Sequence, residues 1–280
     1  MSETPTVWMN GELMSADEVR VSPFDLGLTV GLGVFETMCA YRGRVFAYDR
    51  HHSRLMESAG ILGLATPSQE VIKKAMTWVI AANDLASGRA RVRVSVTGGV
   101  NPLHGGGAEG SVIITAVHQA EPAGMAKLVV GQHGCDESST MAGIKSASYA
   151  CHVMAYRQAI EAGADEALVL NSRGIVAEGA MSNLFVVKEG KVKTPSLSSG
   201  CLAGVTRAWV IELCEKEGIP CHESVLGEAD VREADEIFIT SSTREVQPAR
   251  MLNDDREAAG PVTAQLAAAY KTLVKQQLGI

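Results

Sequence analysis

Lys145 is the residue of this chain whose surroundings best suit covalent chemistry. It lies in the segment Ser138–Val153, which is otherwise nearly uncharged. A lysine in such surroundings can be desolvated, which lowers its pKa and favours a neutral amine able to form a Schiff base. The competing interpretation is a surface lysine between two elements, and the residue by itself leaves both interpretations open.

Glu178 is the second residue with possible chemistry. It follows the apolar residues Ile175-Val-Ala177, just before another predicted strand. A carboxylate at this position is either an exposed loop residue or a buried acceptor for a cationic partner.

Two junctions in the second half of the chain could bind phosphate. Leu202-Ala-Gly-Val-Thr-Arg207 begins a predicted helix, where backbone N–H groups and the helix dipole favour an anion. Thr240-Ser-Ser-Thr-Arg244 follows a predicted buried strand and offers four consecutive side-chain donors. A threonine cap at the first junction and a Ser/Thr turn at the second explain the same residues. No spacing rule connects these junctions with Lys145 and Glu178.

Composition narrows the class of protein that could carry such residues. The chain has 280 residues, 46% hydrophobic and 20% charged, with a net charge of −7. These values indicate a globular protein and argue against nucleic-acid binding by phosphate neutralisation. No apolar run approaches the roughly 18 residues of a membrane span, and no secretory signal is visible, so we expect a cytoplasmic protein with no membrane partner. The cysteine and histidine spacings match no standard metal site, so we expect no metal.

The hydrophobic pattern predicts mixed strands and helices on both sides of one boundary. Strands are expected at 91–97, 111–117, 127–130, 166–170, 184–187, 191–193 and 236–240, and helices at 50–62, 69–85, 153–163, 205–217 and from Pro261 onward. The apolar face of the helix at 153–163 is expected to carry Val153, Tyr156 and Ile160. The pattern lapses at Glu121-Pro-Ala-Gly124, which predicts domains at 1–121 and 122–280. The glycine-rich stretch Gly98–Gly110 is expected to be a mobile loop.

Taken together, the sequence resembles the fold-type IV pyridoxal-phosphate enzymes. This family includes branched-chain and D-amino-acid aminotransferases and aminodeoxychorismate lyase. The matching segments occur in family order over nearly the whole chain: Gly31-Leu-Gly-Val-Phe-Glu-Thr37, Arg50-His-His-Ser-Arg-Leu-Met-Glu-Ser-Ala59, Ile144-Lys-Ser-Ala-Ser-Tyr149, Gly163-Ala-Asp-Glu-Ala167, Ala177-Glu-Gly-Ala-Met-Ser-Asn-Leu-Phe185, Thr194-Pro-Ser-Leu197, Leu202–Arg207 and Thr240-Ser-Ser-Thr-Arg-Glu-Val-Gln-Pro248.

The resemblance implies a role for the lysine and the carboxylate. Lys145 matches the Schiff-base lysine, which holds pyridoxal 5′-phosphate and transfers a proton between the substrate Cα and the cofactor. Glu178 matches the carboxylate that faces the pyridine nitrogen. A negative charge there keeps that nitrogen protonated, so that the ring accepts electrons.

The resemblance also implies a phosphate site. Arg54 matches the phosphate-binding arginine, whose planar fork suits a bidentate contact. Val205 and Thr206 match the helix N-terminus that faces the phosphate. Ser242 and Thr243 match the last phosphate and substrate-carboxylate contacts.

The implied fold is α/β (α+β), with a small N-terminal α/β domain, a larger C-terminal domain with a barrel-like sheet, and the cofactor between them. Such enzymes are typically homodimers with residues of both subunits near the substrate. Phe35 and Tyr149 match substrate-facing positions, and the Gly98–Gly110 loop is a further contributor to the substrate entrance.

The resemblance leaves two reactions open. Phe35-Glu-Thr-Met-Cys39 and Ser182-Asn183 depart from the usual branched-chain pattern, and Phe35 replaces a tyrosine common in D-amino-acid enzymes. Tyr149 and the segment Ser241–Pro248 favour an aminotransferase acting on amino acids and 2-keto acids. Gly-Val-Phe-Glu-Thr and Glu-Gly-x-x-Ser-Asn-Leu-Phe also occur in aminodeoxychorismate lyases, which release pyruvate to form 4-aminobenzoate. A non-catalytic phosphate- or cofactor-binding protein is disfavoured because Lys145, Glu178 and Arg54 are all present.

Overall fold

The computed structural model describes residues 4–103, 110–132, 134–255 and 258–280. The chain divides into two compact units. Unit 1 contains Met1–Glu121, Ile144–Ser148 and Leu278–Ile280, and unit 2 contains Pro122–Gly143 and Tyr149–Gln277. The short segment with Lys145 therefore belongs to unit 1, although it follows the boundary expected near residue 121.

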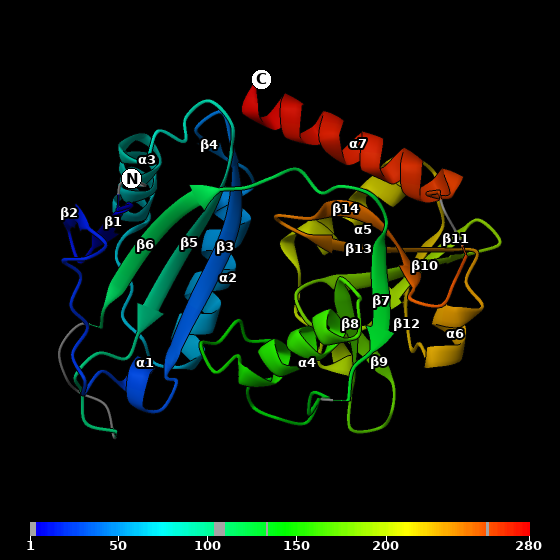
Figure 1. Cartoon of the computed structure of the whole chain (residues 1–280), viewed down its shortest axis with the longest axis horizontal. Coiled ribbons are helices and arrows are strands. Elements are labelled where there is room, and N and C mark those ends of the chain that lie inside the picture. The colour runs from blue at the N-terminus through cyan, green and yellow to red at the C-terminus, as the bar shows by residue number, and fades with distance from the viewer. Residues whose placement is uncertain (1–3, 104–109, 133, 256–257) are drawn as a thin grey trace. The chain divides into compact units, whose positions relative to one another are not determined.

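Unit 1 is built on one antiparallel sheet with helices on one face (Figure 1). Its strands are β1 (Thr6–Met9), β2 (Glu12–Ser15), β3 (Gly33–Tyr41), β4 (Arg44–Val45), β5 (Arg89–Thr97) and β6 (Val112–His118), and its helices are α1 (Leu26–Thr29), α2 (Tyr48–Ile61) and α3 (Gln69–Ala82). In the described residues the strand order is β2-β1-β6-β5-β3-β4. The strands expected at 91–97 and 111–117 and the helices expected at 50–62 and 69–85 are confirmed within a few residues at each end.

The two faces of this sheet differ because alternate residues of a strand point to opposite sides. Val92, Val94 and Val96 of β5 are buried in a core shared with α2 and α3. Arg93 and Ser95 lie on the opposite face, where Arg93 Nε donates to Ser95 Oγ at 3.0 Å. The helices therefore cover one face, and the other carries polar side chains.

Two glycines bring the Lys145 segment against β3. Phe35 N–H donates to the Lys145 carbonyl at 3.0 Å, and Ala147 N–H donates to the Gly33 carbonyl at 2.7 Å. A Cβ on Gly33 would meet the Val96 carbonyl oxygen at 2.8 Å, and one on Gly31, at φ +70°, would meet Ser148 Oγ at 2.5 Å. The motif glycines thus permit a close approach of two backbones.

Unit 2 contains a larger mixed sheet. Its strands are β7 (Ala126–Val130), β8 (Glu166–Leu170), β9 (Val176–Gly179), β10 (Asn183–Lys188), β11 (Lys191–Pro195), β12 (Cys221–Ser224), β13 (Glu236–Ser241) and β14 (Glu245–Met251), and its helices are α4 (Ala150–Glu161), a 3₁₀ turn at Leu197–Ser199, α5 (Val205–Lys216), α6 (Glu228–Arg232) and α7 (Pro261–Leu278). Among the described strands the order is β12-β11-β10-β13-β14-β7-β8-β9. The edge strand β9 returns to β10 through a bridge between Gly179 and Ser182, so the sheet curves on itself. The expected mixed α/β fold with a barrel-like sheet in the second half is confirmed.

The apolar face predicted for α4 is only partly correct: Tyr156 packs, partly buried, against the core, but Ile160 does not. Ala155 and Ala159 are fully buried against β8, whereas Ile160 is 49% exposed. Small alanine side chains let the helix approach the sheet closely, and this packing overrides the preference of the larger residues for burial.

In the part of the chain that the structure describes, none of the helices combines the length and the apolar character that a bilayer span requires. The glycines at 105–107 of the predicted mobile loop lie outside the described residues.

Candidate active site

The candidate residues of unit 1 gather around Phe35. Lys145 Nζ lies 4.6 Å from the centre of the Phe35 ring, and Arg93 Cζ lies 3.7 Å from it. Phe35 is 5% exposed. An aromatic face attracts cations, so the ring sets the positions of an amine and a guanidinium on the face of the sheet that the helices do not cover.

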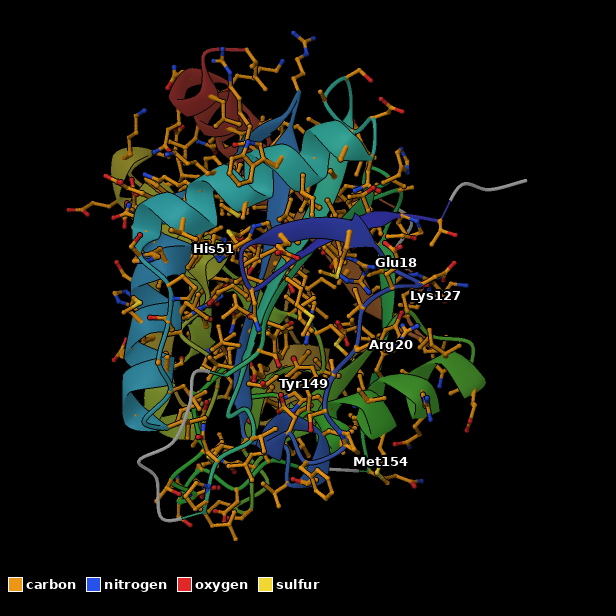
Figure 2. All side chains as sticks on the ribbon, turned by 90° about the vertical axis from the view of Figure 1, so that its left-hand side faces the viewer. Glu18, Arg20, His51, Lys127, Tyr149 and Met154 are labelled. Atoms are coloured by element: carbon orange, nitrogen blue, oxygen red, sulfur yellow. The ribbon has the colours of Figure 1, made fainter. Side chains whose placement is uncertain are left out.

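Arg54 belongs to a buried ionic network beneath this group. Glu36, 1% exposed, accepts from Arg54 Nε at 2.7 Å, from Arg54 Nη2 at 2.8 Å and from His51 Nδ1 at 2.7 Å. His51 and Arg54 come from successive turns of α2, where residues three apart share a face; Figure 2 labels His51. One edge of the guanidinium, formed by Nε and Nη2, is therefore taken by Glu36.

The same network sets the protonation of its members. Burial raises the pKa of Glu36, but the charge of Arg54 and the hydrogen bonds from His51 and Arg54 outweigh it and lower that pKa to about 2. Burial lowers the pKa of His51 below its usual value, and the nearby charges of Arg54 and Lys145 act in the same direction against the opposing effect of Glu36. Glu36 is thus ionised and His51 neutral near pH 7, with its Nδ1–H donating to the carboxylate.

Glu178 in unit 2 is a buried carboxylate with its two oxygens in different surroundings. It is 8% exposed, which favours the buried-acceptor interpretation of its sequence position. Its Oε2 accepts from Asn183 Nδ2 at 3.2 Å and from the Leu202 N–H at 3.0 Å. Its Oε1 lies 3.5 Å from His152 Nε2. The carboxylate is oriented mainly through one oxygen, and the other retains capacity for a further donor.

The loop that begins α5 is held by the same asparagine. Asn183 Nδ2 also donates to the Leu202 carbonyl at 2.9 Å, and a Cβ on Gly204 would collide with Asn183 Oδ1. Gly204 is the N-cap of α5 and makes no side-chain cap, so the N–H groups of the first turn, at Val205 and Thr206, keep the anion-binding character of a helix N-terminus.

Ser242 and Thr243 lie in the turn between β13 and β14. Ser241 Oγ accepts from the Arg244 N–H at 3.1 Å and lies 3.4 Å from Thr243 Oγ1. At the end of β13, Thr240 is 1% exposed, and its Oγ1 has no hydrogen-bond partner within the described residues. A buried hydroxyl without a partner is costly, so this turn is suited to receive a polar ligand.

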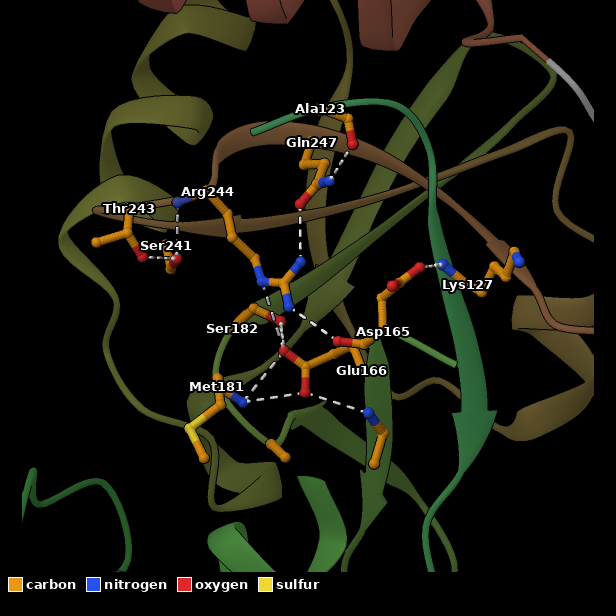
Figure 3. Close-up of polar contacts among 12 residues, drawn as sticks. Ala123, Lys127, Asp165, Glu166, Met181, Ser182, Ser241, Thr243, Arg244 and Gln247 are labelled. Atoms are coloured by element: carbon orange, nitrogen blue, oxygen red, sulfur yellow. Dashed lines mark hydrogen bonds and ion pairs between the residues drawn. The ribbon is translucent and has the colours of Figure 1, made fainter. Parts of the chain in front are cut away.

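A second buried carboxylate, that of Glu166, connects the β13–β14 turn with the β9–β10 turn that follows Glu178, as Figure 3 shows. Glu166, fully buried in β8, accepts from the Met181 N–H at 3.3 Å and from Ser182 Oγ at 3.0 Å. Its Oε2 lies 3.9 Å from Arg244 Nε, while Arg244 Nη2 donates to the Asp165 carbonyl at 2.9 Å. Burial raises the pKa of Glu166, and Arg244 and the hydrogen bonds counteract this only in part. The pair therefore ties the β9–β10 turn to the β13–β14 turn.

Tyr149 contacts the turn that follows β9, the strand of Glu178. Its hydroxyl donates to the Ala180 carbonyl at 3.1 Å, and its ring stacks on His152.

Within unit 1 the structure therefore places Lys145 and Arg93 at the Phe35 ring, and the Arg54 network at the next residue of β3, Glu36. Within unit 2, hydrogen bonds join Glu178 to the start of α5, and Glu166 joins the β9–β10 turn to the turn that holds Ser242 and Thr243. Sequence reasoning assigned no role to several further contributors. Five lie within the matched motifs and two, Arg93 and His152, lie outside them; the five are Glu36, His51, Glu166, Asn183 and Arg244. A signal was available for Glu36, since a charged residue inside the otherwise largely apolar strand Gly33–Tyr41 indicates a buried charge with a partner.

The family model for amino-transferase class IV matches residues 33–252. The chain belongs to the class IV aminotransferase family.

Named relatives of this family match nearly end to end. The chain is 33% identical to a putative branched-chain-amino-acid aminotransferase of Methanocaldococcus jannaschii, over 95% of this chain and 96% of the relative. It is 31% identical to a D-alanine aminotransferase of Listeria monocytogenes, with 93% of each chain covered. It is also 29% identical to an aminodeoxychorismate lyase of Bacillus subtilis, over 97% of this chain and 96% of the relative.

Solved structures match as closely. The branched-chain aminotransferase of Thermoproteus uzoniensis with norvaline has a TM-score of 0.89 at 30% identity, covering 98% of this chain and 95% of that chain. A second branched-chain amino acid aminotransferase was solved in complex with N-(5′-phosphopyridoxyl)-L-glutamate. It has a TM-score of 0.87 at 28% identity, covering 98% of this chain and 95% of that chain. The resemblance to fold-type IV enzymes is thereby confirmed, and with it the pyridoxal-phosphate cofactor of this class.

The residues present in unit 2 fit this cofactor. Glu178 is a buried carboxylate that a ring nitrogen could face, and the first turn of α5, the Thr240 hydroxyl and the Ser242–Thr243 turn are groups that could donate to a phosphate. In the described residues no group of three or more His, Cys, Asp or Glu side chains is arranged to hold a metal ion.

Proposed function

We propose that this class IV aminotransferase moves an amino group between an amino acid and a 2-keto acid, using pyridoxal phosphate bound through Lys145. The observation that carries the proposal is the buried Glu178 carboxylate, oriented by two donors on Oε2. A buried negative charge of this kind requires a cationic partner, and a protonated pyridine nitrogen is such a partner.

The bound cofactor supplies an aldehyde that condenses with amines and a ring that accepts electrons from the substrate Cα. Lys145 Nζ holds the cofactor and then accepts and returns the proton of the substrate Cα. Glu178 keeps the proton on the ring nitrogen. The first turn of α5, Ser242 and Arg54 bind the phosphate, and Thr243 binds the substrate carboxylate.

Arg93 supports a substrate with a second carboxylate. It lies over the Phe35 ring, as Lys145 does, and its guanidinium suits bidentate recognition of a carboxylate. Phe35 and Tyr149 line the substrate position. We expect a dicarboxylic 2-keto acid to be an efficient acceptor.

A homodimer is supported by an exposed apolar patch on unit 1. The patch consists of Phe24, Leu28, Val30, Val100 and Leu103, which are between 55% and 80% exposed. Its two segments are joined by hydrogen bonds from Leu26 N–H to the Gly99 carbonyl at 2.9 Å and from Gly98 N–H to the Leu32 carbonyl at 2.8 Å. A contiguous apolar patch of this kind marks an association surface. Light scattering on a Leu28→Asp variant tests this: the wild-type chain is expected to be dimeric and the variant monomeric.

The cysteines fit a cytoplasmic location. All six are free thiols, as the reducing cytosol favours.

Aminodeoxychorismate lyase is the alternative reaction, favoured by Ser182-Asn183 in place of the usual branched-chain pair. Both reactions need Lys145 and Glu178, so the site residues described above do not discriminate between them.

The test begins with the purified chain and added pyridoxal phosphate. We expect a yellow protein whose cofactor is fixed onto Lys145 by borohydride, and a Lys145→Ala variant that is not labelled. A colourless chain that gains no absorbance with the cofactor overturns the proposal. Amino donors are then screened with a keto-acid acceptor, and pyruvate release from aminodeoxychorismate is measured separately. Pyruvate release without keto-acid-dependent turnover would assign the lyase reaction instead.

A further inference from the structure

His152 makes two contacts with candidate site residues of its own unit. It lies in the first turn of α4, with its Nε2 3.5 Å from Glu178 Oε1. Its ring stacks on Tyr149 at a centroid distance of 4.4 Å and an interplanar angle of 6°. Tyr149 is itself anchored by its hydroxyl to the Ala180 carbonyl. The imidazole is therefore held between an anchored aromatic ring and the carboxylate.

The contact falls on the Glu178 oxygen that the backbone loop does not hold. Oε2 has two donors, Asn183 Nδ2 and the Leu202 N–H, whereas Oε1 faces His152. A carboxylate with a donor near each oxygen cannot rotate about its terminal bond without losing one of them. The Glu178 side chain is 10% exposed and that of His152 24%, so solvent screens this contact only in part.

We propose that His152 is a positioning residue that orients Oε1 of Glu178 toward the ring nitrogen of pyridoxal phosphate. This inference rests on the proposed function, since it needs the cofactor nitrogen at Glu178. Nε2 lies 3.5 Å from this oxygen, and the stack on Tyr149 fixes the plane of the imidazole and hence the position of Nε2.

The competing explanation is that His152 only stabilises the first turn of α4. The two explanations predict different affinities for ligands with and without the ring nitrogen. The full-length chain, freed of cofactor, is titrated with pyridoxal phosphate and with a deaza analogue that carries C–H in place of the ring nitrogen. Glu178 can interact favourably with the ring nitrogen of pyridoxal phosphate but not with the C–H group that replaces it in the deaza analogue.

Three variants give the comparison its controls. His152→Phe retains a flat ring for Tyr149 but removes the donor. His152→Gln retains an N–H donor without the ring. His222→Phe makes the same change at an exposed histidine of β12.

We expect His152→Phe to bind pyridoxal phosphate about fivefold more weakly, because it loses the polar contact of Nε2 with the carboxylate, and to bind the deaza analogue as the wild-type chain does. His152→Gln should recover most of the loss, and His222→Phe should change neither affinity. Should His152→Phe not fold, His152→Leu serves in its place.

Equal losses for both ligands, an unchanged affinity for pyridoxal phosphate, or a His152→Gln variant as weak as His152→Phe would each overturn the role of His152. A wild-type chain that binds both ligands equally overturns it as well. A wild-type chain that binds neither ligand refutes the proposed function itself.

Discussion

The buried network of Glu36, Arg54 and His51 makes the stability of unit 1 depend on pH. Glu36 has its pKa lowered from 4.5 to about 2 although burial alone would raise it. A depressed carboxyl pKa stabilises the folded state fully above the unfolded-state pKa, and that stabilisation is lost as the pH falls through the folded-state pKa. The shift corresponds to about 3 kcal/mol near pH 7, of which about 1 kcal/mol is lost by pH 4 and about 2 kcal/mol by pH 3.

The perturbation that isolates this effect is Glu36→Gln. It removes the charge while keeping the size of the side chain, and it leaves the Arg54 guanidinium, 12% exposed, without its buried anion. Breaking a buried pair in this way costs roughly 3–5 kcal/mol at pH 7. Because the variant has no carboxyl to protonate at this position, the difference in unfolding free energy from the wild-type chain should shrink as the pH falls from 7 to 3.

Urea unfolding followed by tryptophan fluorescence measures this difference. Trp8 and Trp78 belong to unit 1 and Trp209 to unit 2, so a Trp209→Phe background restricts the signal to unit 1. Asp49→Asn, at an exposed α2 carboxylate, is the matched control and should cost less than about 1 kcal/mol. A difference between wild type and Glu36→Gln that is the same at pH 7 and pH 3 would refute the reasoning.

Three further changes test the site. Arg93→Leu should raise KM for 2-oxoglutarate by roughly 10–100-fold, the loss of a charged hydrogen-bond donor, and change KM for pyruvate much less; equal effects on both acceptors would contradict a side-chain carboxylate contact. Glu178→Gln keeps an acceptor for the Asn183 and Leu202 donors but removes the charge, so kcat should fall roughly 100-fold with unfolding unchanged; a kcat near wild type argues against the role of the carboxylate. Gly204→Ala places a Cβ against Asn183 Oδ1. It should weaken pyridoxal phosphate binding about 10-fold, which corresponds to about 1.4 kcal/mol of binding free energy. An unchanged dissociation constant would show that the loop adapts to the added methyl group.

Local patterns in the sequence were sufficient for many elements. The alternation of valine with polar residues predicts β5 because strand side chains alternate between faces whatever surrounds them. The Glu189-Gly190 pair predicts the β10–β11 hairpin, where both residues adopt positive φ. The helix α3 begins at Gln69 as expected, with Ser68 accepting from the Val71 N–H. Each of these depends on interactions within a few residues.

The sequence by itself also predicted which residues carry the chemistry, Lys145 and Glu178, once the ordered motifs indicated the family. It did not determine what holds them. The donors of Glu178 come from Asn183, five residues on, and from Leu202, and a further contact comes from His152 on a preceding helix. The buried pair of Glu166 and Arg244 spans 78 positions. These contacts depend on strand register and on how α4 packs, and no local pattern encodes either. Tertiary structure alone decided them, because the free energy of a buried charge depends on every group that surrounds it.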